Sequence, residues 1–285
     1  MKFRVNIRLM NYPELIEGEL KKFSPLETDK SIDSGVVVGA GDSYAAALVV
    51  ESKTRRKAIA LDPYEAINLN VDKPYVIVSI SGKTKTNIEL AKVKKREGRK
   101  VIAITANASS PLAQNSDEII IVPYKADTTL PGTLSFLLAL SALYSLFNLE
   151  LTEDYKRAKP IMLKEQPFFI GQGENYGIAY YATLKMNEIF CEPANYEKLE
   201  LFPHSPIFST RKRQIVILSS KDEREKKLKE LINFTDVSLT ECHDAFCNAF
   251  SIIHSIVERM RKENWNRICF VDDKQILNIS SEMIY

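Results

Sequence analysis

Small hydroxyl side chains gather after one apolar run of the sequence, and their spacing points to anion binding. The run that begins at Tyr75 is rich in β-branched residues, which is typical of a strand buried on both faces. Ser79, Ser81, Gly82 and Thr84 follow it, just before a helical pattern begins. Hydroxyls and the free N–H groups of a helix start suit a phosphate dianion. The alternative is an ordinary turn with capping residues, and the spacing excludes a Walker loop.

Two residues of the second half could move protons. Glu188 shares a helical stripe with Tyr181 and Leu184, at i, i+3 and i+7. A carboxyl in apolar surroundings has a raised pKa and can exchange protons near neutral pH. The alternative is a helix-end glutamate at the edge of a core. His204 is the one histidine of three that falls in a polar loop, and histidine titrates near neutral pH.

A glycine turn near the N-terminus offers a second contact for a ligand. A short apolar strand runs into Gly39, Gly41 and Ser43, and an alanine-rich helix follows. Gly41 lets the backbone approach a ligand, and Ser43 places a hydroxyl at the helix start. The pattern lacks the full GxGxxG fingerprint, so it does not favour a dinucleotide site. The alternative is that the glycines only let the helix pack closely against the sheet.

The elements that would position these residues alternate between strand and helix. Short apolar strands are expected just before Gly39, from Ile59 to Pro63, from Tyr75 up to the break at Gly82, at 100–105 and at 117–123, and a long apolar helix follows Thr133 up to Leu149. This alternation predicts a parallel sheet with helices on both faces. Ligands of such sheets bind beyond the carboxyl ends of the strands, where Ser43, Ser79, Ser81, Thr84 and Thr105 all fall.

The second half of the chain repeats the first. Residues 1–30 predict one or two lead-in helices, and 150–164 predict a helix and linker. Gly171 and Gly173 then align with the first glycine pair, and Ser220 aligns with Ser81. The sequence thus predicts an α/β protein of two tandem three-layer α/β/α domains with mostly parallel sheets, at 1–155 and 156–285. Chance similarity of two strand-turn-helix units is the alternative.

The repeat differs from the first half where a ligand would bind. Asn175 stands in place of Ser43, and the Ser-Gly-Lys-Thr that ends at Thr84 becomes Ser-Lys-Asp-Glu. Carboxylates therefore stand where an anion would bind, and the second half is poorly suited to phosphate. The second half has a different set of polar residues instead.

Composition excludes several classes of protein. A net charge of +2 over 285 residues gives no reason to expect nucleic acid or a membrane surface as partner. Four cysteines without CxxC or zinc spacing predict buried thiols in a reducing compartment. Neither a membrane span nor a signal peptide is visible, so a cytoplasmic location is expected. No metal or other cofactor is expected.

These motifs together resemble the sugar isomerase (SIS) domain family. The resemblance rests on GxGxS at Gly39–Ser43, on SxSGxT at Ser79–Thr84, and on Ile-Thr…Ser-Pro-Leu-Ala at 104–113 followed by Asp-Glu-Ile. The duplication resembles the isomerase half of glucosamine-6-phosphate synthase, archaeal glucosamine-6-phosphate deaminases and phosphosugar isomerases. It implies an isomerase or deaminase that binds a sugar phosphate, with Ser43, Ser79, Ser81 and Thr84 on the substrate.

The resemblance also implies roles in the second half. Leu184-Lys-Met-Asn-Glu188 resembles the family's Leu-Lys-x-x-Glu, whose glutamate shuttles a proton between C1 and C2. Residues 200–206 resemble Glu-Leu-x-His-Gly-Pro with one residue inserted, and the family's histidine, here His204, opens the sugar ring, often from the partner subunit of a homodimer. The family's C-terminal lysine is absent, and Lys274 is the nearest. A sugar-phosphate sensor without catalysis is therefore the alternative to an enzyme.

Overall fold

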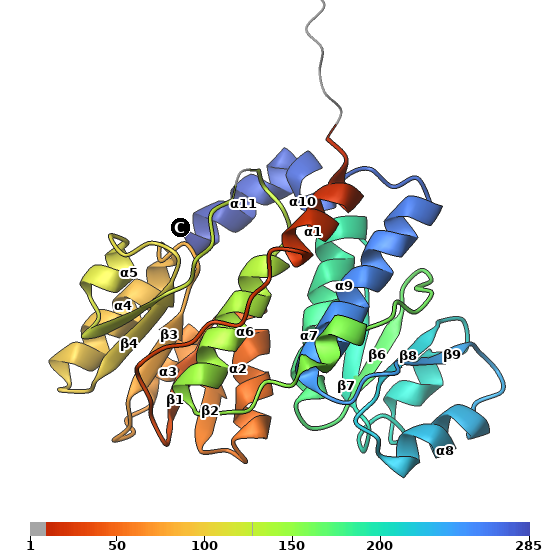
Figure 1. Ribbon diagram of the computed structural model, residues 1–285, viewed down its shortest axis with the longest axis horizontal. Coiled ribbons are helices and arrows are strands. Elements are labelled where there is room, and N and C mark those ends of the chain that lie inside the picture. The colour runs from red at the N-terminus through yellow and green to blue at the C-terminus, as the bar shows by residue number, and fades with distance from the viewer. Residues whose placement is uncertain (1–9, 127) are drawn as a thin grey trace, which may run out of the picture.

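The computed structural model describes residues 10–126 and 128–285, and their strands form two parallel sheets (Figure 1). The first has the order β2-β1-β3-β4-β5 and the second the order β7-β6-β8-β9, with every neighbouring pair parallel. The strands of the first sheet are β1 (Gly35–Val38), β2 (Ala58–Leu61), β3 (Tyr75–Val78), β4 (Val101–Thr105) and β5 (Glu118–Ile121). Those of the second are β6 (Phe168–Gly171), β7 (Asn195–Lys198), β8 (Ile215–Leu218) and β9 (Val237–Leu239).

Helices join successive strands, as parallel pairing requires. The helices of the first half are α1 (Tyr12–Leu20), α2 (Asp42–Lys53), α3 (Pro63–Asn68), α4 (Lys85–Arg96), α5 (Pro111–Gln114) and α6 (Leu134–Leu146). Those of the second half are the 3₁₀-helix η1 (Glu153–Arg157), α7 (Asn175–Lys185), the π-helix η2 (Met186–Phe190), the 3₁₀-helix η3 (Pro206–Ser209), α8 (Glu223–Leu231), α9 (Ala245–Lys262), α10 (Cys269–Asp272) and α11 (Lys274–Ile284).

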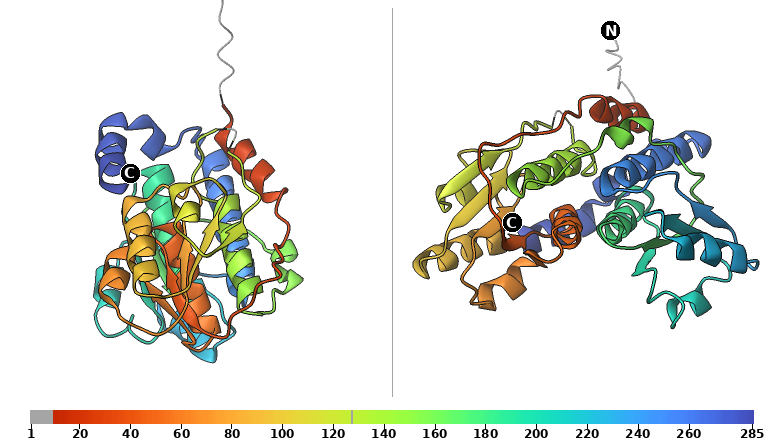
Figure 2. Two further views of the ribbon diagram at one scale, coloured as in Figure 1. Left: turned by 90° about the vertical axis from the view of Figure 1, so that its left-hand side faces the viewer. Right: turned by 60° about the horizontal axis from the view of Figure 1, so that its bottom comes forward.

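The largest core lies between the two sheets. Alternate residues of a strand face opposite sides, so Val37 points into this central core while Val36 and Val38 point to the outer face. Helices α2, α6, α7 and α9 fill the centre, and the right-hand view of Figure 2 shows them between the sheets. Two smaller cores lie outside, under α3, α4 and α5 on one sheet and under α8 on the other. Each sheet is therefore covered on both faces.

The structure confirms the predicted α/β class and the tandem sheets, and it corrects several elements. Residues 23–30 form no helix, and the predicted helix at 150–164 is only the short η1. The helix predicted from Tyr176 to Cys191 changes to a π-helix after Lys185. Residues 1–9 lie outside the described chain, so a first lead-in helix there stays a prediction. The division of the chain at residue 155 also stays a prediction.

Matching sheet orders support the inferred duplication. A Cβ on Gly39 would meet the backbone of the following helix at 2.6 Å, and one on Gly171 would meet it at 2.1 Å. Both helices thus begin equally close to their strands. When Gly39 is matched with Gly171, the register of the neighbouring strands matches Ser79 with Ser219. The predicted alignment of Ser220 with Ser81 is therefore wrong by one residue.

The two ends of the chain pack on the opposite half. Helix α1 lies against α9, where Arg261 forms ion pairs with Glu14 and Glu17, each at 2.6 Å. Helix α11 extends over the first half, where the Glu282 carbonyl accepts a hydrogen bond from Lys85. Figure 1 shows α11 above the first sheet, with the C-terminus near β3. The last residues of the second half therefore reach the first.

The prediction of free thiols is wrong. All four cysteines lie in the described part of the chain and form two disulfides, Cys191–Cys269 and Cys242–Cys247. The fold brings their Cα atoms to 5.6 and 5.4 Å, which is within bridging distance. The spacing of the cysteines along the chain does not reveal the first pair, because its partners are 78 residues apart.

Within residues 10–126 and 128–285, the structure contains no helix with both the length and the apolar character that a membrane crossing requires.

The contact of α2 with α7 leaves no room for a side chain at Gly177. A Cβ there would lie 2.7 Å from the Ala45 carbonyl oxygen and 2.8 Å from the Val49 amide. We expect Gly177→Ala to lower the free energy of unfolding by about 1–3 kcal/mol, because backbone atoms would have to move. Urea unfolding followed by circular dichroism measures it. Gly18→Ala is the control, since no atom lies within 4 Å of its added Cβ. Equal stabilities for the two variants would contradict this account of the interface.

Candidate functional site

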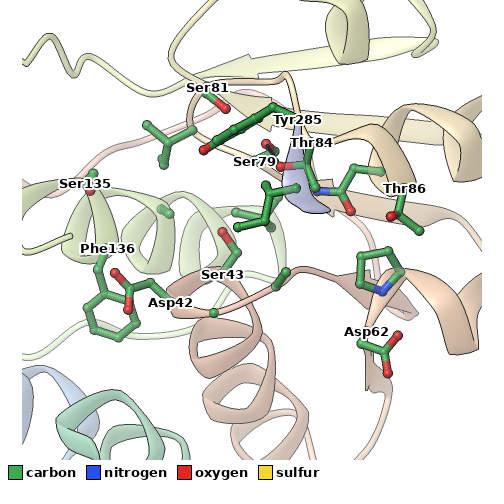
Figure 3. Close-up of a pocket in the computed structure, with 18 of the residues that line it drawn as sticks. Asp42, Ser43, Asp62, Ser79, Ser81, Thr84, Thr86, Ser135, Phe136 and Tyr285 are labelled. Atoms are coloured by element: carbon green, nitrogen blue, oxygen red, sulfur yellow. Dashed lines mark hydrogen bonds between the residues drawn. The ribbon is translucent and has the colours of Figure 1, made fainter. Parts of the chain in front are cut away.

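A cavity of about 700 Å³ lies beyond the carboxyl ends of β1 and β3. Its walls come from the turns after these strands, the starts of α2, α4 and α6, the π-helix η2, and the last residues of α11. Figure 3 shows Ser79 and Thr84 on one side of it, Asp42 beside Phe136 on the other, and Ser43 between them. The predicted site residues that line this cavity are Gly41, Ser43, Ser79, Ser81, Thr84 and Glu188.

The turn after β3 presents its hydroxyls to the cavity. The hydroxyls of Ser79 and Thr84 lie 3.4 Å apart, and the Ser81 hydroxyl accepts a hydrogen bond from the Lys83 amide. Gly82 does not line the cavity, but it has a φ of +63°, and a Cβ there would lie 2.1 Å from the Ser110 hydroxyl. Its part is therefore to shape the turn. Thr105 is buried and supports the same turn by donating to the Ile80 carbonyl.

Helix α4 points its N-terminus at these hydroxyls. Thr84 is its N-cap residue, yet among the described residues its side chain makes no capping hydrogen bond. The first turn of α4 contains no acidic residue, so its amide dipoles stay uncompensated there. Asn87 is buried, lines the cavity, and has a side-chain oxygen without a hydrogen-bond partner in the described chain. Hydroxyls, amide N–H groups and a helix dipole together form an end of the cavity that suits an anion.

The opposite end is built around a buried lysine. Lys185 is fully buried and donates hydrogen bonds to Asp42 at 2.8 Å and to Glu188 at 2.5 Å. Its ammonium also lies 5.1 Å from the centre of the Tyr181 ring. Asp42 begins α2 and Glu188 lies in η2, so the lysine joins the two halves of the chain. Both carboxylates line the cavity, whereas Lys185 lies behind them.

These neighbours change the protonation of the group. Burial raises the pKa of Asp42 to about 7, and the negative charge of Glu188 adds to this against the attraction of Lys185. Burial lowers the pKa of Lys185, but its two carboxylate partners outweigh burial and raise it above the ordinary value. The sequence predicted a raised carboxyl pKa on an apolar stripe. Asp42, whose pKa is raised here, is a carboxyl that the sequence analysis did not select.

Contacts from α9 and from the segments after it hold the π-helical turn that carries Glu188. A π-helix is rare and is frequently found at functional sites, because its extra residue leaves a backbone group free to be re-aimed. The Ile189 carbonyl accepts a hydrogen bond from the Trp265 indole at 3.0 Å. Just beyond the turn, Glu192 pairs with the buried Arg259, and the Cys191–Cys269 disulfide joins it to α10. Glu188 therefore projects from a turn that side chains of α9 and the segments after it hold in place.

His204 lies in a different place. It lines a smaller cavity next to α8 with Glu200, Arg224 and Leu231, and it does not line the cavity that holds Glu188. The chain therefore brings Glu188 together with the predicted phosphate ligands, but not His204. Lys274 is exposed at the start of α11 and also lies outside the cavity wall.

The second half fills its own corresponding turn with protein groups. The Glu225 carboxylate accepts hydrogen bonds from the hydroxyls of Ser219 and Ser220 and from the Ser220 amide, at 2.6–2.9 Å. Asn175, which replaces Ser43, donates to the Ser219 carbonyl and accepts from Asn248. The prediction that a carboxylate stands where an anion would bind is correct, although the carboxylate is that of Glu225. This turn is occupied by the chain itself.

Sequence reasoning missed Asp42, Asn87 and Lys185. Asp42 and Lys185 were within the quoted motifs, between the glycines and Ser43 and inside Leu-Lys-x-x-Glu. A charged residue at the first position of α2 was a visible signal, but nothing in the sequence showed that its partner lies 143 residues away.

Residues 31–149 match the family model of the SIS domain. Two curated relatives are glutamine--fructose-6-phosphate aminotransferases [isomerizing]. The one from Clostridium tetani is 24% identical over 238 residues, which are 69% of this chain and 39% of the relative. The one from Sulfurisphaera tokodaii is 24% identical over 230 residues, which are 70% of this chain and 38% of the relative. The chain thus spans about two fifths of the length of these relatives.

Solved structures share the fold over most of the chain. Glucosamine-6-phosphate deaminase from Thermotoga maritima has a TM-score of 0.68 at 19% identity, covering 89% of this chain and 92% of that one. The C-terminal domain of glucosamine-fructose-6-phosphate aminotransferase from Francisella tularensis has a TM-score of 0.60 at 18% identity, covering 87% of this chain and 94% of that one. The match of residues 31–149 to the SIS domain model agrees with the motifs at Gly39–Ser43 and Ser79–Thr84, and the chain shares the fold of these solved structures over most of its length.

Proposed function

We propose that this protein is an enzyme that acts on a hexose 6-phosphate, as an aldose–ketose isomerase or an amino-sugar phosphate deaminase. Substrates of this class include glucosamine 6-phosphate and fructose 6-phosphate. The observation that carries the proposal is one cavity with an anion-binding end and a paired glutamate at its other end. The names of the relatives, an isomerizing aminotransferase and a deaminase, agree with this substrate class.

The phosphate would bind at the turn after β3. Ser79, Ser81 and Thr84 offer hydroxyls, and the uncapped start of α4 offers amide N–H groups. Gly41 and Ser43 would contact the sugar between the two ends, because they line the cavity at the start of α2. No cofactor is needed for this binding.

Glu188 would carry the proton. Its carboxylate takes the proton from C2 of the open-chain aldose, and the electron pair forms an enediol, or an enolamine when C2 bears an amino group. Returning that proton to C1 gives the ketose, or an imine at C2 that water hydrolyses to the ketose and ammonia. Lys185 holds Glu188 in place from behind, at 2.5 Å. The ion pair between the two side chains keeps the carboxylate at the cavity wall.

A second candidate is a sugar-phosphate sensor without catalysis. The separation of His204 from the cavity favours it, because the chain alone supplies no histidine for ring opening there. A homodimer in which His204 of the partner subunit reaches the cavity would remove this difficulty. The two candidates differ in turnover and not in binding.

We expect Ser81→Ala and Thr84→Val each to weaken binding of glucitol 6-phosphate, an open-chain alcohol that cannot react, by roughly tenfold. Each loses one hydrogen bond to a charged group. Isothermal titration calorimetry measures the affinity. Ser220→Ala is the matched control, since Glu225 already occupies its hydroxyl in the second half, and it should keep the affinity within about twofold. If Ser81→Ala and Thr84→Val bind as tightly as the unaltered protein, the phosphate lies elsewhere.

Glu188→Gln should lower turnover by at least about a hundredfold, because glutamine cannot accept the proton from C2. Formation of fructose 6-phosphate from glucosamine 6-phosphate, or from glucose 6-phosphate, follows the reaction. Binding of glucitol 6-phosphate should persist, which separates lost chemistry from lost folding. Glu165→Gln is the control, as an exposed glutamate that does not line the cavity. Tight binding without turnover in the unaltered protein would favour the sensor instead.

Mixing two inactive variants tests the partner's histidine. Each of Glu188→Gln and His204→Ala should be inactive alone. A site built from Glu188 of one subunit and His204 of the partner subunit is intact in half the sites of each mixed dimer. Random mixing should therefore restore about a quarter of the original activity. Co-refolding the two variants and assaying fructose 6-phosphate measures this. Full activity of His204→Ala alone, or no recovery on mixing, would rule out a shared site.

A further inference from the structure

One oxygen of Asp42 lacks a hydrogen-bond partner at the wall of the cavity. Its Oδ2 accepts from Lys185 at 2.8 Å, whereas Oδ1 is buried and has no partner among the described residues. The side chain as a whole is 22% exposed and lines the cavity. A buried acceptor left unpaired is unfavourable, so a donor that enters the cavity would gain by reaching it.

The surroundings of Asp42 enclose its Oδ2 but leave Oδ1 without a hydrogen-bond partner among the described residues. Gly132 packs against Oδ2, since a Cβ there would lie 2.0 Å from it. The Gly132 carbonyl in turn accepts from the Tyr181 hydroxyl at 2.9 Å, and Phe136 stacks on the Tyr181 ring. Lys185 and Gly132 therefore enclose Oδ2, while the side chain as a whole keeps part of its surface at the cavity wall.

The charges at this end favour a cation. Lys185 supplies one positive charge against the two carboxylates that it contacts. Asp42 and Glu188 line the cavity at this end, and the residues lining the cavity in the described chain include no lysine, arginine or histidine. A positively charged donor would thus meet an excess of negative charge here, at the end away from the phosphate-binding hydroxyls.

We propose that Asp42 is a specificity-determining residue, whose carboxylate accepts a hydrogen bond from an ammonium group at C2 of the sugar phosphate. Sugar phosphates with an amino group at C2 then bind better than those with a hydroxyl group at C2. This inference rests on the proposed function, in which Glu188 works at C1 and C2. Asp42 contacts the same Lys185 ammonium as Glu188, so a substituent on C2 comes next to it.

The pH dependence follows from the groups around Asp42. Those that face it are Lys185, Tyr180 and Tyr181 on α7 and Glu188 on η2, while α6 contributes the uncharged Ser135 and Phe136. Burial raises the pKa of Asp42 to about 7, so its carboxylate form becomes more populated as the pH rises through that value. The preference for an amino sugar should grow from about pH 6 to pH 8, in step with this ionisation.

The experiment compares two unreactive ligands on the full chain. They are 2-amino-2-deoxyglucitol 6-phosphate and glucitol 6-phosphate, and calorimetry gives their affinities at pH 6, 7 and 8. We expect the amino compound to bind roughly tenfold more tightly at pH 7. In Asp42→Asn the two should bind within about twofold of each other, without the rise toward pH 8. The amine's own ionisation affects both proteins equally, so the difference between them isolates Asp42.

Asp62→Asn is the matched control. Asp62 lines the same cavity, but its carboxylate caps α3 by accepting from the Tyr64 and Glu65 amides, and asparagine caps helices as well. It should keep the preference. If Asp42→Asn does not fold, Gly132→Ala displaces the Asp42 carboxylate without removing its charge, and it should lower the preference too.

The outcomes separate this inference from the function on which it rests. Equal binding of both ligands by the unaltered protein, or an unchanged preference in Asp42→Asn, would overturn the role of Asp42 and leave the proposed function standing. Failure of the protein to bind either ligand would overturn both. Loss of the preference in Asp42→Asn, with glucitol 6-phosphate still bound, supports the proposal.

Discussion

The buried ammonium of Lys185 is the constraint on which the site depends. A charge without water must keep its ionic partners, since leaving one uncompensated strongly destabilises the fold. Its partners come from both halves, Asp42 from the start of α2 and Glu188 from η2. The carboxylates are therefore placed correctly only when the halves dock. Neither half alone would hold the acidic end of the cavity.

Close packing of helices provides this docking. Helices α2 and α7 approach until the Gly177 Cα leaves no room for a methyl group against Ala45 and Val49. That approach brings Lys185, two turns further along α7, up to the first turn of α2. The central core thus sets the geometry of the site as well as much of the burial. A substitution at Gly177 would disturb both, even though it lies outside the cavity wall.

Local features of the fold were predictable from the sequence, and long-range contacts were not. Buried strands such as Tyr75–Val78 and the hydroxyl turn after them follow from residue types within a few positions. The Asp42–Lys185 pair and the Cys191–Cys269 disulfide join residues far apart in the chain, and no local pattern encodes them. The π-turn at Glu188 also escaped prediction, because its residues fit an ordinary helix.

The turn after β8 in the second half and the turn after β3 in the first half differ in the groups that hydrogen-bond to them. In the second half, the Glu225 carboxylate satisfies the hydroxyls and amide that follow β8. In the first half, the hydroxyls of Ser79 and Thr84 in the turn after β3 hydrogen-bond only to each other among the described residues. A duplicated turn that binds a carboxylate in one copy has the chemistry to bind an external anion in the other.

The cavity also orients a ligand by its charges alone. An anion is favoured at the start of α4, where dipoles and hydroxyls meet, and disfavoured beside Asp42 and Glu188. The proposed sugar phosphate would therefore have one favourable direction, with its phosphate at the turn after β3 and its far end at the carboxylates. Because this orientation needs no basic side chain at the wall, the charge of Lys185 stays committed to the two carboxylates that it joins.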